Sequence, residues 1–419
     1  MDELKLIDLS DSQTLIKIPD LSGAPNLKKL ILRHCTRLCK IHASLGNLKR
    51  LIQLDLNGCK CLESLPYKIS LEALEILDLG GCSRLNMFPK IVGNMPHLAK
   101  LNLSETAIKD LSFLVEHSIG HIKLDLGHGK NLSTLPDTTC SLLSLKTLTL
   151  SGCSKLHELP ENLGNIKGLK TLDVSRTTIR RLPSSIVLLK NLRKLSLSSC
   201  EGLSSKSSNK LLSFPLMQPR RIPDSMGMLV RTLSGIQSLT ELDLSYCKIR
   251  AIPYDINCLS ALRRLNLRGN NFDCLPESII QLSNLNVLFM GGCTNLRLLP
   301  ELPSNIELID AEGCISLETL PARPEDNFQC LRLLNCVKVI DNEGYDNIFL
   351  TMLRHDLFKV SLSLSLSLSL SLSLSLSLSL CSNHLDFLCF RDQIMIGYVC
   401  LLVEVLFQNI LAIKVRGLH

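Results

Sequence analysis

The chain has 419 residues, of which 45% are hydrophobic and 4% aromatic, with no tryptophan. Its formal net charge of +7 argues against strong attraction of the whole chain to nucleic acid or to a membrane surface. Length alone would predict two or three globular domains, but an internal repeat overrides that estimate.

A leucine pattern returns every 21 to 24 residues from the first residues to about Lys338, with one longer step. Its clearest copy, at 262–276, reads L-R-R-L-N-L-R-G-N-N-F-D-C-L-P. Leu265 and Leu267 lie two residues apart, so they share one face of an extended chain while Asn266 points to the other. The pattern is that of a leucine-rich repeat. It predicts an α/β solenoid shaped as a horseshoe, with a parallel sheet on the concave side.

One small-residue position of the motif marks fourteen strands in the sequence. It falls at Ser12, Cys35, Cys59, Cys82, Thr106, Gly129, Cys153, Thr177, Cys200, Cys247, Asn270, Cys293, Cys314 and Cys336. We expect its nine cysteines to cap turns as small buried thiols rather than to serve redox or metal chemistry. The step from Cys200 to Cys247 is two repeats long, and the prolines within 204–234 predict an irregular insert, a loop with one partial coil.

The far side of most repeats begins with Leu-Pro, as at Leu159-Pro160 and Leu182-Pro183. Proline fixes φ and lacks an N–H donor, which suits the first turn of a helix. Short helices or 3₁₀ turns are therefore predicted on the convex side.

The sequence changes character after the repeats, so we divide the chain at that point. Residues 1–338 are predicted to be the solenoid, 339–360 a truncated post-repeat segment, 361–380 a low-complexity tract of Ser-Leu pairs, and 381–419 an apolar, non-native tail. The apolar run at 394–413 is long enough to cross a bilayer, but Glu404 within it opposes insertion.

Motifs for catalysis and cofactor binding are absent from the sequence. It contains no phosphate-binding loop, no H-E-x-x-H and no G-x-S-x-G, so we expect neither an enzyme nor a cofactor. His117, His121 and His128 gather near Asp125, but alternation along a strand would point them to opposite faces. No metal site is predicted there.

The outward positions of the strands are the expected working surface. One column is acidic (Asp8, Asp55, Asp78, Asp125, Asp173, Asp243 and Asp310) and a neighbouring one is basic (Lys29, Lys100, Lys123, Lys194 and Arg264). Mutual neutralisation of the two columns is one interpretation. The other is a protein-binding site where the columns change character, because arginine and exposed aromatic residues favour interface centres. Its candidate residues are Arg193, Lys194, Tyr246, Arg263, Arg264, Arg268 and Phe289.

Several phrases carry a family resemblance. They are I-P-D-L-S-G-A-P-N-L at 18–27, S-L-G-N-L-K-R-L at 44–51, L-P-E-S-I-I-Q-L at 275–282 and L-P-E-L-P-S-N-I at 299–306. They resemble plant intracellular disease-resistance receptors of the class with Toll/interleukin-receptor, nucleotide-binding and leucine-rich-repeat domains. The similarity covers about residues 4–354. The first two of those domains are not among these residues, so their activities do not carry over.

The resemblance implies a protein-recognition and regulatory module in plant defence. Its expected partners are a pathogen effector, a guarded host protein or the receptor's own nucleotide-binding domain, and not nucleic acid or a membrane. The cytoplasm is the expected compartment, with the nucleus as a second one. A free-standing intracellular scaffold for signalling proteins is the alternative function.

Overall fold

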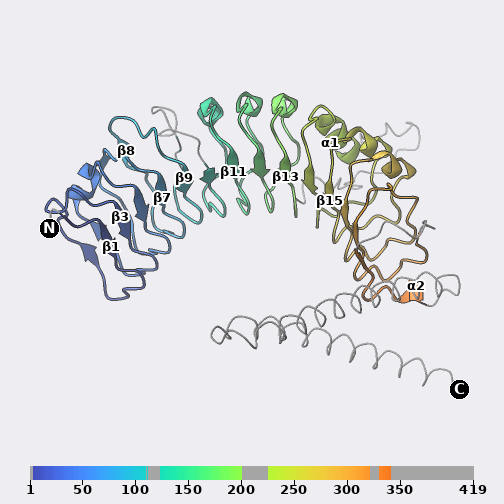
Figure 1. Ribbon diagram of the computed structural model, residues 1–419, viewed down its shortest axis with the longest axis horizontal. Helices are drawn as coiled ribbons and strands as arrows, with labels where there is room; N and C mark the ends of the chain where they lie inside the picture. The colour runs from blue at the N-terminus through green and yellow to red at the C-terminus, as the bar shows by residue number, and fades with distance from the viewer. Residues whose placement is uncertain (1–2, 110, 112–122, 201–224, 321–329, 341–419) are drawn as a thin grey trace, which may run out of the picture. The chain divides into compact units, whose positions relative to one another are not determined.

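The computed structural model describes residues 3–109, 111, 123–200, 225–320 and 330–340, which lie in the first of two compact units, residues 1–343. Their coils follow an arc, and each coil adds one short strand to a 14-stranded sheet (Figure 1). The strands are β1 (Leu6–Asp8), β3 (Lys29–Ile31), β5 (Gln53–Asp55), β7 (Ile76–Asp78), β9 (Lys100–Asn102), β10 (Lys123–Asp125), β11 (Thr147–Thr149), β12 (Thr171–Asp173), β13 (Lys194–Ser196), β14 (Glu241–Asp243), β15 (Arg264–Asn266), β16 (Val287–Phe289), β17 (Leu308–Asp310) and β18 (Cys330–Arg332).

All neighbouring strands of this sheet are parallel and in register, so the same motif position repeats across it. Leu242, Leu265 and Leu288, the central residues of β14, β15 and β16, are register partners. Each is at most 2% exposed, because its side chain points into the coil and packs against the coils on both sides. The predicted solenoid with a parallel sheet is confirmed.

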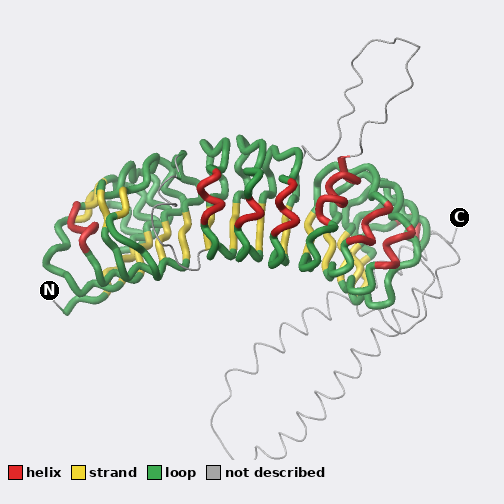
Figure 2. The backbone as a smooth tube through the Cα atoms, turned by 90° about the horizontal axis from the view of Figure 1, so that it is seen from above, coloured by secondary structure: helices red, strands yellow, loops and turns green. Residues whose placement is uncertain are grey.

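The other side of the coils carries helices and two small sheets (Figure 2). The 3₁₀ helices are η1 (Ala43–Asn47), η3 (Asp137–Ser141), η4 (Leu163–Asn165), η5 (Ser184–Leu188), η7 (Tyr254–Cys258) and η8 (Glu277–Gln281). Proline immediately precedes η3, η5, η7 and η8, as the Leu-Pro pattern predicted. In the first four coils β2 (Lys17–Ile18) pairs with β4 (Lys40–Ile41), and β6 (Lys68–Ile69) with β8 (Lys90–Ile91).

The long step between Cys200 and Cys247 leaves the sheet continuous. β13 pairs directly with β14, with Leu195 opposite Leu242. The helix α1 (Ser225–Leu233) lies within the segment 204–234 and contacts η5 and η7. Its Leu229, Val230 and Leu233 are buried, so the second part of the insert packs onto the convex helices. The repeat pattern does not predict this helix.

The cysteines of the repeated small-residue position are buried thiols. The Sγ of each donates a hydrogen bond to a backbone carbonyl of the preceding coil, as from Cys59 to Leu32 at 3.1 Å and from Cys293 to Leu267 at 3.2 Å. Asn270 fills the same position with an amide that donates to Leu244 and Leu267. Burial raises the pKa of Cys59 to about 12, so this thiol stays protonated at neutral pH. Their predicted role as turn caps is confirmed.

The remaining predicted segments fall mostly outside the described residues. The helix α2 (Val337–Ile340) ends the described chain, and 341–419 contains nearly all of the post-repeat segment, the Ser-Leu tract and the apolar tail. Their boundaries stay predictions. Within the described ranges, none of the helices has the length and apolar character needed to cross a bilayer.

Candidate protein-binding face

Three columns of side chains cover the exposed face of the long sheet. We call them the first, middle and third columns, and in the coil of β15 they hold Arg264, Asn266 and Arg268. These residues alternate with Leu265 and Leu267, which are 0% exposed. Because the register is constant, a residue's column follows from its repeat position alone.

The predicted basic stretch is not continuous in the structure. Along the first column the order is Lys194, Glu241, Arg264 and Val287, so a carboxylate separates the two cations. The Lys194 Nζ lies 2.9 Å from a Glu241 carboxylate oxygen and is therefore neutralised. Arg264 is exposed and has no ion pair among the described residues. Sequence reasoning missed Glu241 because β14 follows β13 only after the long insert.

Arg268 and Phe289 do meet, and a third residue fixes them. The Arg268 guanidinium lies over the Phe289 ring, with Cζ 4.6 Å from the ring centroid, and it also forms an ion pair with Asp310. Asp310 belongs to β17, two coils away, and its side chain is 1% exposed. A Cβ at Gly291 would lie 3.6 Å from the Arg268 Nε and 3.4 Å from an Asp310 oxygen. These are ordinary contact distances, so the Arg268 side chain passes close to Gly291 on its way to Asp310. Arg268 is thus held in place and its charge is neutralised.

Tyr246 lies in the turn after β14, where its backbone is left-handed with φ of 56°. Its side chain is 57% exposed and its ring lies above Gly269 of the next coil, where a Cβ would come within 2.3 Å of two ring carbons. The same arrangement places His34 above Gly58 and His128 above Gly152. A ring at this turn position followed one repeat later by glycine is the sequence signal that could have revealed this contact in advance.

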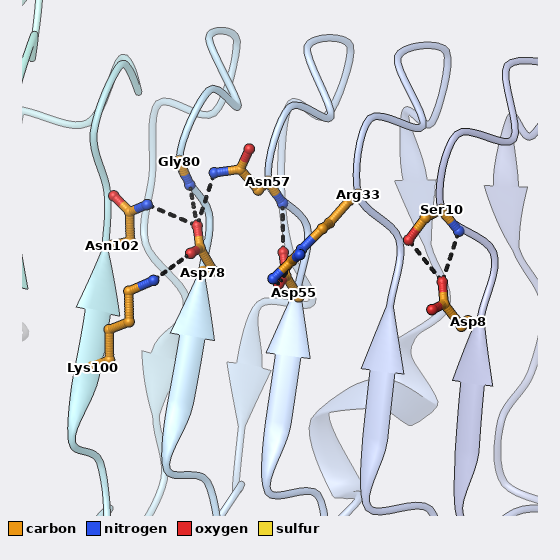
Figure 3. Close-up of polar contacts among 9 residues, drawn as sticks. All are labelled: Asp8, Ser10, Arg33, Asp55, Asn57, Asp78, Gly80, Lys100 and Asn102. Carbon is orange, nitrogen blue, oxygen red and sulfur yellow. Dashed lines mark hydrogen bonds and ion pairs between the residues drawn. The ribbon is translucent and has the colours of Figure 1, made fainter. Parts of the chain in front are cut away.

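The acidic middle column contains two kinds of aspartate. The Oδ1 atoms of these residues accept the backbone N–H two positions ahead, so each aspartate caps the turn after its strand, as Asp8 does for Ser10 (Figure 3). Asp55 and Asp78 are in addition buried and ion-paired, to Arg33 at 2.7 Å and to Lys100 at 2.9 Å. The aspartates lie in the outward column as predicted, but Asp55, Asp78 and Asp310 are buried beneath their salt-bridge partners and are not accessible, which the sequence did not predict.

Asp8, Asp125, Asp173 and Asp243 are the second kind, with no ion pair in the described part of the chain. Burial raises the pKa of Asp125, and the neighbouring charges of Asp173 and Asp78 add to the effect. Burial acts in the same direction on Asp78, but hydrogen bonds from Lys100, Asn57 and the Gly80 N–H outweigh it and lower its pKa below the usual value. Mutual neutralisation of the two columns thus holds at Asp78 and fails at Asp125.

Of the predicted histidine cluster, only His128 and Asp125 belong to the described residues. His117 and His121 lie outside the described residues, and the ring of His128 lies above Gly152 of the next coil. Across the described ranges, no group of three histidine, cysteine, aspartate or glutamate side chains could hold a metal ion.

Comparisons with known proteins identify the repeats. A leucine-rich-repeat region model matches residues 123–246, a model of the leucine-rich repeats of disease resistance protein RPS4B-like proteins matches 70–159, and a single-repeat model matches 238–259 and 261–282. TMV resistance protein N of Nicotiana glutinosa is 37% identical over 72% of this chain and 25% of its own length. The chain is a leucine-rich-repeat protein homologous to plant disease-resistance proteins.

A second relative and a solved structure also match this leucine-rich-repeat protein. Disease resistance-like protein DSC1 of Arabidopsis thaliana is 37% identical over 74% of the chain and 23% of its own length. The chain thus spans about a quarter of the length of these relatives. Among solved structures, the TLR13–ssRNA13 complex matches 78% of the chain and 43% of the TLR13 chain at 21% identity with a TM-score of 0.50, which supports the fold alone. The resemblance to disease-resistance receptors is confirmed.

Proposed function

We propose that this leucine-rich-repeat protein is the recognition and regulatory module of a plant immune receptor, and that the face over β13–β16 binds a protein partner. The observations that carry the proposal are the exposed ring of Tyr246 and the half-buried Phe289–Arg268 stack on the same face. Aromatic residues and arginine are the side chains that dominate the centres of protein interfaces. The homology to disease-resistance proteins supports the immune setting.

The geometry of the face supports an ordered rather than an adaptable contact surface. Gly269 holds space for the Tyr246 ring, and Asp310 holds the Arg268 guanidinium against Phe289. Side chains fixed before binding lose less conformational entropy when a partner arrives. Fourteen strands about 4.8 Å apart form a row roughly 65 Å long, which is ample for an interface of about 800 Å² per partner.

The unpaired cations next to this group would determine orientation and association rate. Arg193, Arg263 and Arg264 are exposed and have no ion pair in the described part of the chain. Exposed charges at the edge of an interface mainly steer encounter and favour a partner of opposite charge. The partner is a pathogen effector, a guarded host protein or the receptor's own nucleotide-binding domain held at rest. Binding rather than catalysis is the activity we assign.

We also propose that the chain acts in a reducing compartment, the cytoplasm, with the nucleus as a second location. The nine thiols of the repeated position each use their S–H to donate to a carbonyl of the preceding coil, which a disulfide sulfur could not do. Reducing conditions preserve these bonds.

The experiment grafts residues 1–338 onto TMV resistance protein N in place of the homologous repeats and scores cell death in leaves. The test variant changes Arg263→Glu, Arg264→Glu and Phe289→Ser together. We expect either lost recognition or death without a pathogen, at normal protein abundance, because partner contact or autoinhibition depends on this face. Lost recognition identifies an external partner, and unprovoked death identifies the nucleotide-binding domain.

The matched control changes the convex residues Lys40→Glu, Lys68→Glu and Tyr67→Ser, which are exposed and remove the same charge and one aromatic ring. It should leave both recognition and the resting state unchanged. If test and control variants behave alike, the face over β13–β16 has no binding role.

A further inference from the structure

A row of cations lies at the edge where the strands of the central coils begin. We call it the strand-start rim and define it as the residue just before each strand from β11 to β15 together with the first residue of that strand. Its ten positions are Lys146, Thr147, Lys170, Thr171, Arg193, Lys194, Thr240, Glu241, Arg263 and Arg264. Six are cations and one is a carboxylate. The labels β11, β13 and β15 locate these coils in Figure 1.

The backbone aligns these cations across consecutive coils. The Lys170 N–H donates to the Lys146 carbonyl at 2.8 Å, the Arg193 N–H to Lys170 at 2.8 Å, and the Thr240 N–H to Arg193 at 2.9 Å. Such a ladder places equivalent side chains in a row with about 4.8 Å between coils, so that five coils span roughly 19 Å. Lys167 and Lys190, three residues before Lys170 and Arg193, add two exposed cations on the same approach to the strands.

Most of this charge is not neutralised within the described residues. Glu241, the single carboxylate of the rim, pairs with Lys194 at 2.9 Å. Lys146, Lys170, Arg193, Arg263 and Arg264 have no ion pair in the described coils. Like charges on directly neighbouring strands repel each other and reduce stability. An anionic partner would relieve the repulsion between the aligned cations of the rim.

We propose that the strand-start rim docks an acidic amphipathic helix of a protein partner. Acidic side chains at i, i+3 and i+4 on such a helix lie about 5–6 Å apart, close to the spacing of the coils. Leu143, 64% exposed and three residues before Lys146, offers an apolar contact to the leucine face of the same helix. A narrow row of charges fits a rod-shaped partner.

Two other anionic partners match the rim less well. Single-stranded nucleic acid needs aromatic side chains between the cations for base stacking, and the rim has threonine there. A membrane surface would need a broad basic face with several apolar side chains that enter the bilayer, whereas the rim is only two residues wide.

The inference rests on the proposed function in taking the partner to be a protein, and the rim shares Arg193, Lys194, Arg263 and Arg264 with the seven residues named for that function. Its test therefore uses only residues outside those seven. The test variant carries Lys146→Glu, Lys167→Glu, Lys170→Glu and Lys190→Glu in the whole chain. The control carries Lys17→Glu, Lys40→Glu, Lys68→Glu and Lys90→Glu, four lysines of β2, β4, β6 and β8 without ion pairs in the described residues, which give the same change in net charge.

Binding is measured by fluorescence anisotropy with a labelled helical peptide that has glutamate at i, i+3, i+4 and i+7 and leucine on the neighbouring face of the helix. We expect the rim variant to bind at least about tenfold more weakly than the wild type, because four exposed ion pairs that each contribute about twofold are lost. The control variant should bind the peptide like the wild type. A peptide with glutamine in place of glutamate should bind neither the wild type nor the control variant. Circular dichroism spectra and urea midpoints of the variants show whether the solenoid is folded.

Equal weakening in the rim and control variants would overturn the proposal, because attraction would then depend on net charge alone. It would also be overturned if the rim variant lost affinity for single-stranded RNA or for phosphatidylserine vesicles while still binding the peptide. The single change Phe289→Ser, which leaves every rim cation in place, separates the two proposals. Lost recognition in the immune assay together with unchanged peptide binding would assign recognition to the face over β13–β16 and not to the rim.

Discussion

Asp78 and Asp125 occupy the same column of the sheet, yet we expect substitution by asparagine to change stability in opposite directions. Burial acts to raise the pKa of Asp78, but hydrogen bonds from Lys100, Asn57 and the Gly80 N–H outweigh it and lower that pKa. A carboxyl with a lowered pKa stabilises the folded state above its unfolded pKa, and that stability is lost as pH falls.

Burial raises the pKa of Asp125, and no cation in the described residues forms an ion pair with it. Its ionised form therefore opposes folding at pH 7, and the penalty fades as pH falls through the raised pKa.

The structure sets the expected magnitudes. The Asp78→Asn variant keeps an acceptor for the Gly80 N–H but loses the ion pair with Lys100 and the charge that strengthens the bond from Asn102 at 2.8 Å. We expect a loss of about 1–3 kcal/mol, since hydrogen bonds to charged groups contribute about 1.5–3 kcal/mol and exposed ion pairs less. The Asp125→Asn variant keeps the acceptor for the Gly127 N–H and removes only the charge. We expect a gain of up to about 1 kcal/mol.

Urea unfolding followed by circular dichroism at pH 7 and near pH 4.5 measures both variants against the wild type. Long repeat arrays depart from two-state behaviour, so midpoints and slopes are compared together. At the lower pH the gain from Asp125→Asn should shrink, while the loss from Asp78→Asn should persist because its pKa lies below the usual value. Shifts of the same sign at pH 7 would refute the assignment of the two environments.

Three further predictions test the packing of the solenoid. Leu172→Ala should lower the free energy of unfolding by about 2–5 kcal/mol, because the side chain is 0% exposed and leaves a cavity between coils; a loss below about 1 kcal/mol in urea would contradict its burial. Gly269→Ala should lower the free energy of unfolding by about 1–3 kcal/mol, because the φ of 64° disfavours alanine and its Cβ would contact the Tyr246 ring. A double-mutant cycle with Tyr246→Ala should recover only the part of this loss that comes from the ring contact. Full additivity of the two changes would show that the ring lies elsewhere. In a thiol-reagent assay at pH 8, the exposed Cys258 should react quickly, whereas the buried Cys59, with a pKa of about 12, should react only when the chain unfolds. Rapid modification of Cys59 in the folded chain would show that this thiol is accessible to solvent.

The repeat made most of the fold predictable. In Leu262–Pro276 the leucine spacing alone assigns Leu265 and Leu267 to the core and Asn270 to the turn, and all three are at most 1% exposed. This works because each coil contacts only its neighbours, so a local pattern also fixes the tertiary contacts. The helix α1 escaped prediction because its short apolar stripe at Leu229, Val230 and Leu233 does not follow the repeat.

The candidate face was only partly predictable for the same reason. The sequence by itself determined which column each strand side chain joins, and hence that Arg268 and Phe289 face outward from adjacent coils. Tertiary structure alone decided which charges are neutralised, because ion pairs depend on side-chain reach between coils. Arg268 passes over Gly291 to Asp310, 42 residues away in sequence, and Lys194 reaches Glu241 only because β14 follows β13 directly in the sheet. Periodicity specifies the position of a residue, whereas its charge environment is set by the residues that the fold places beside it.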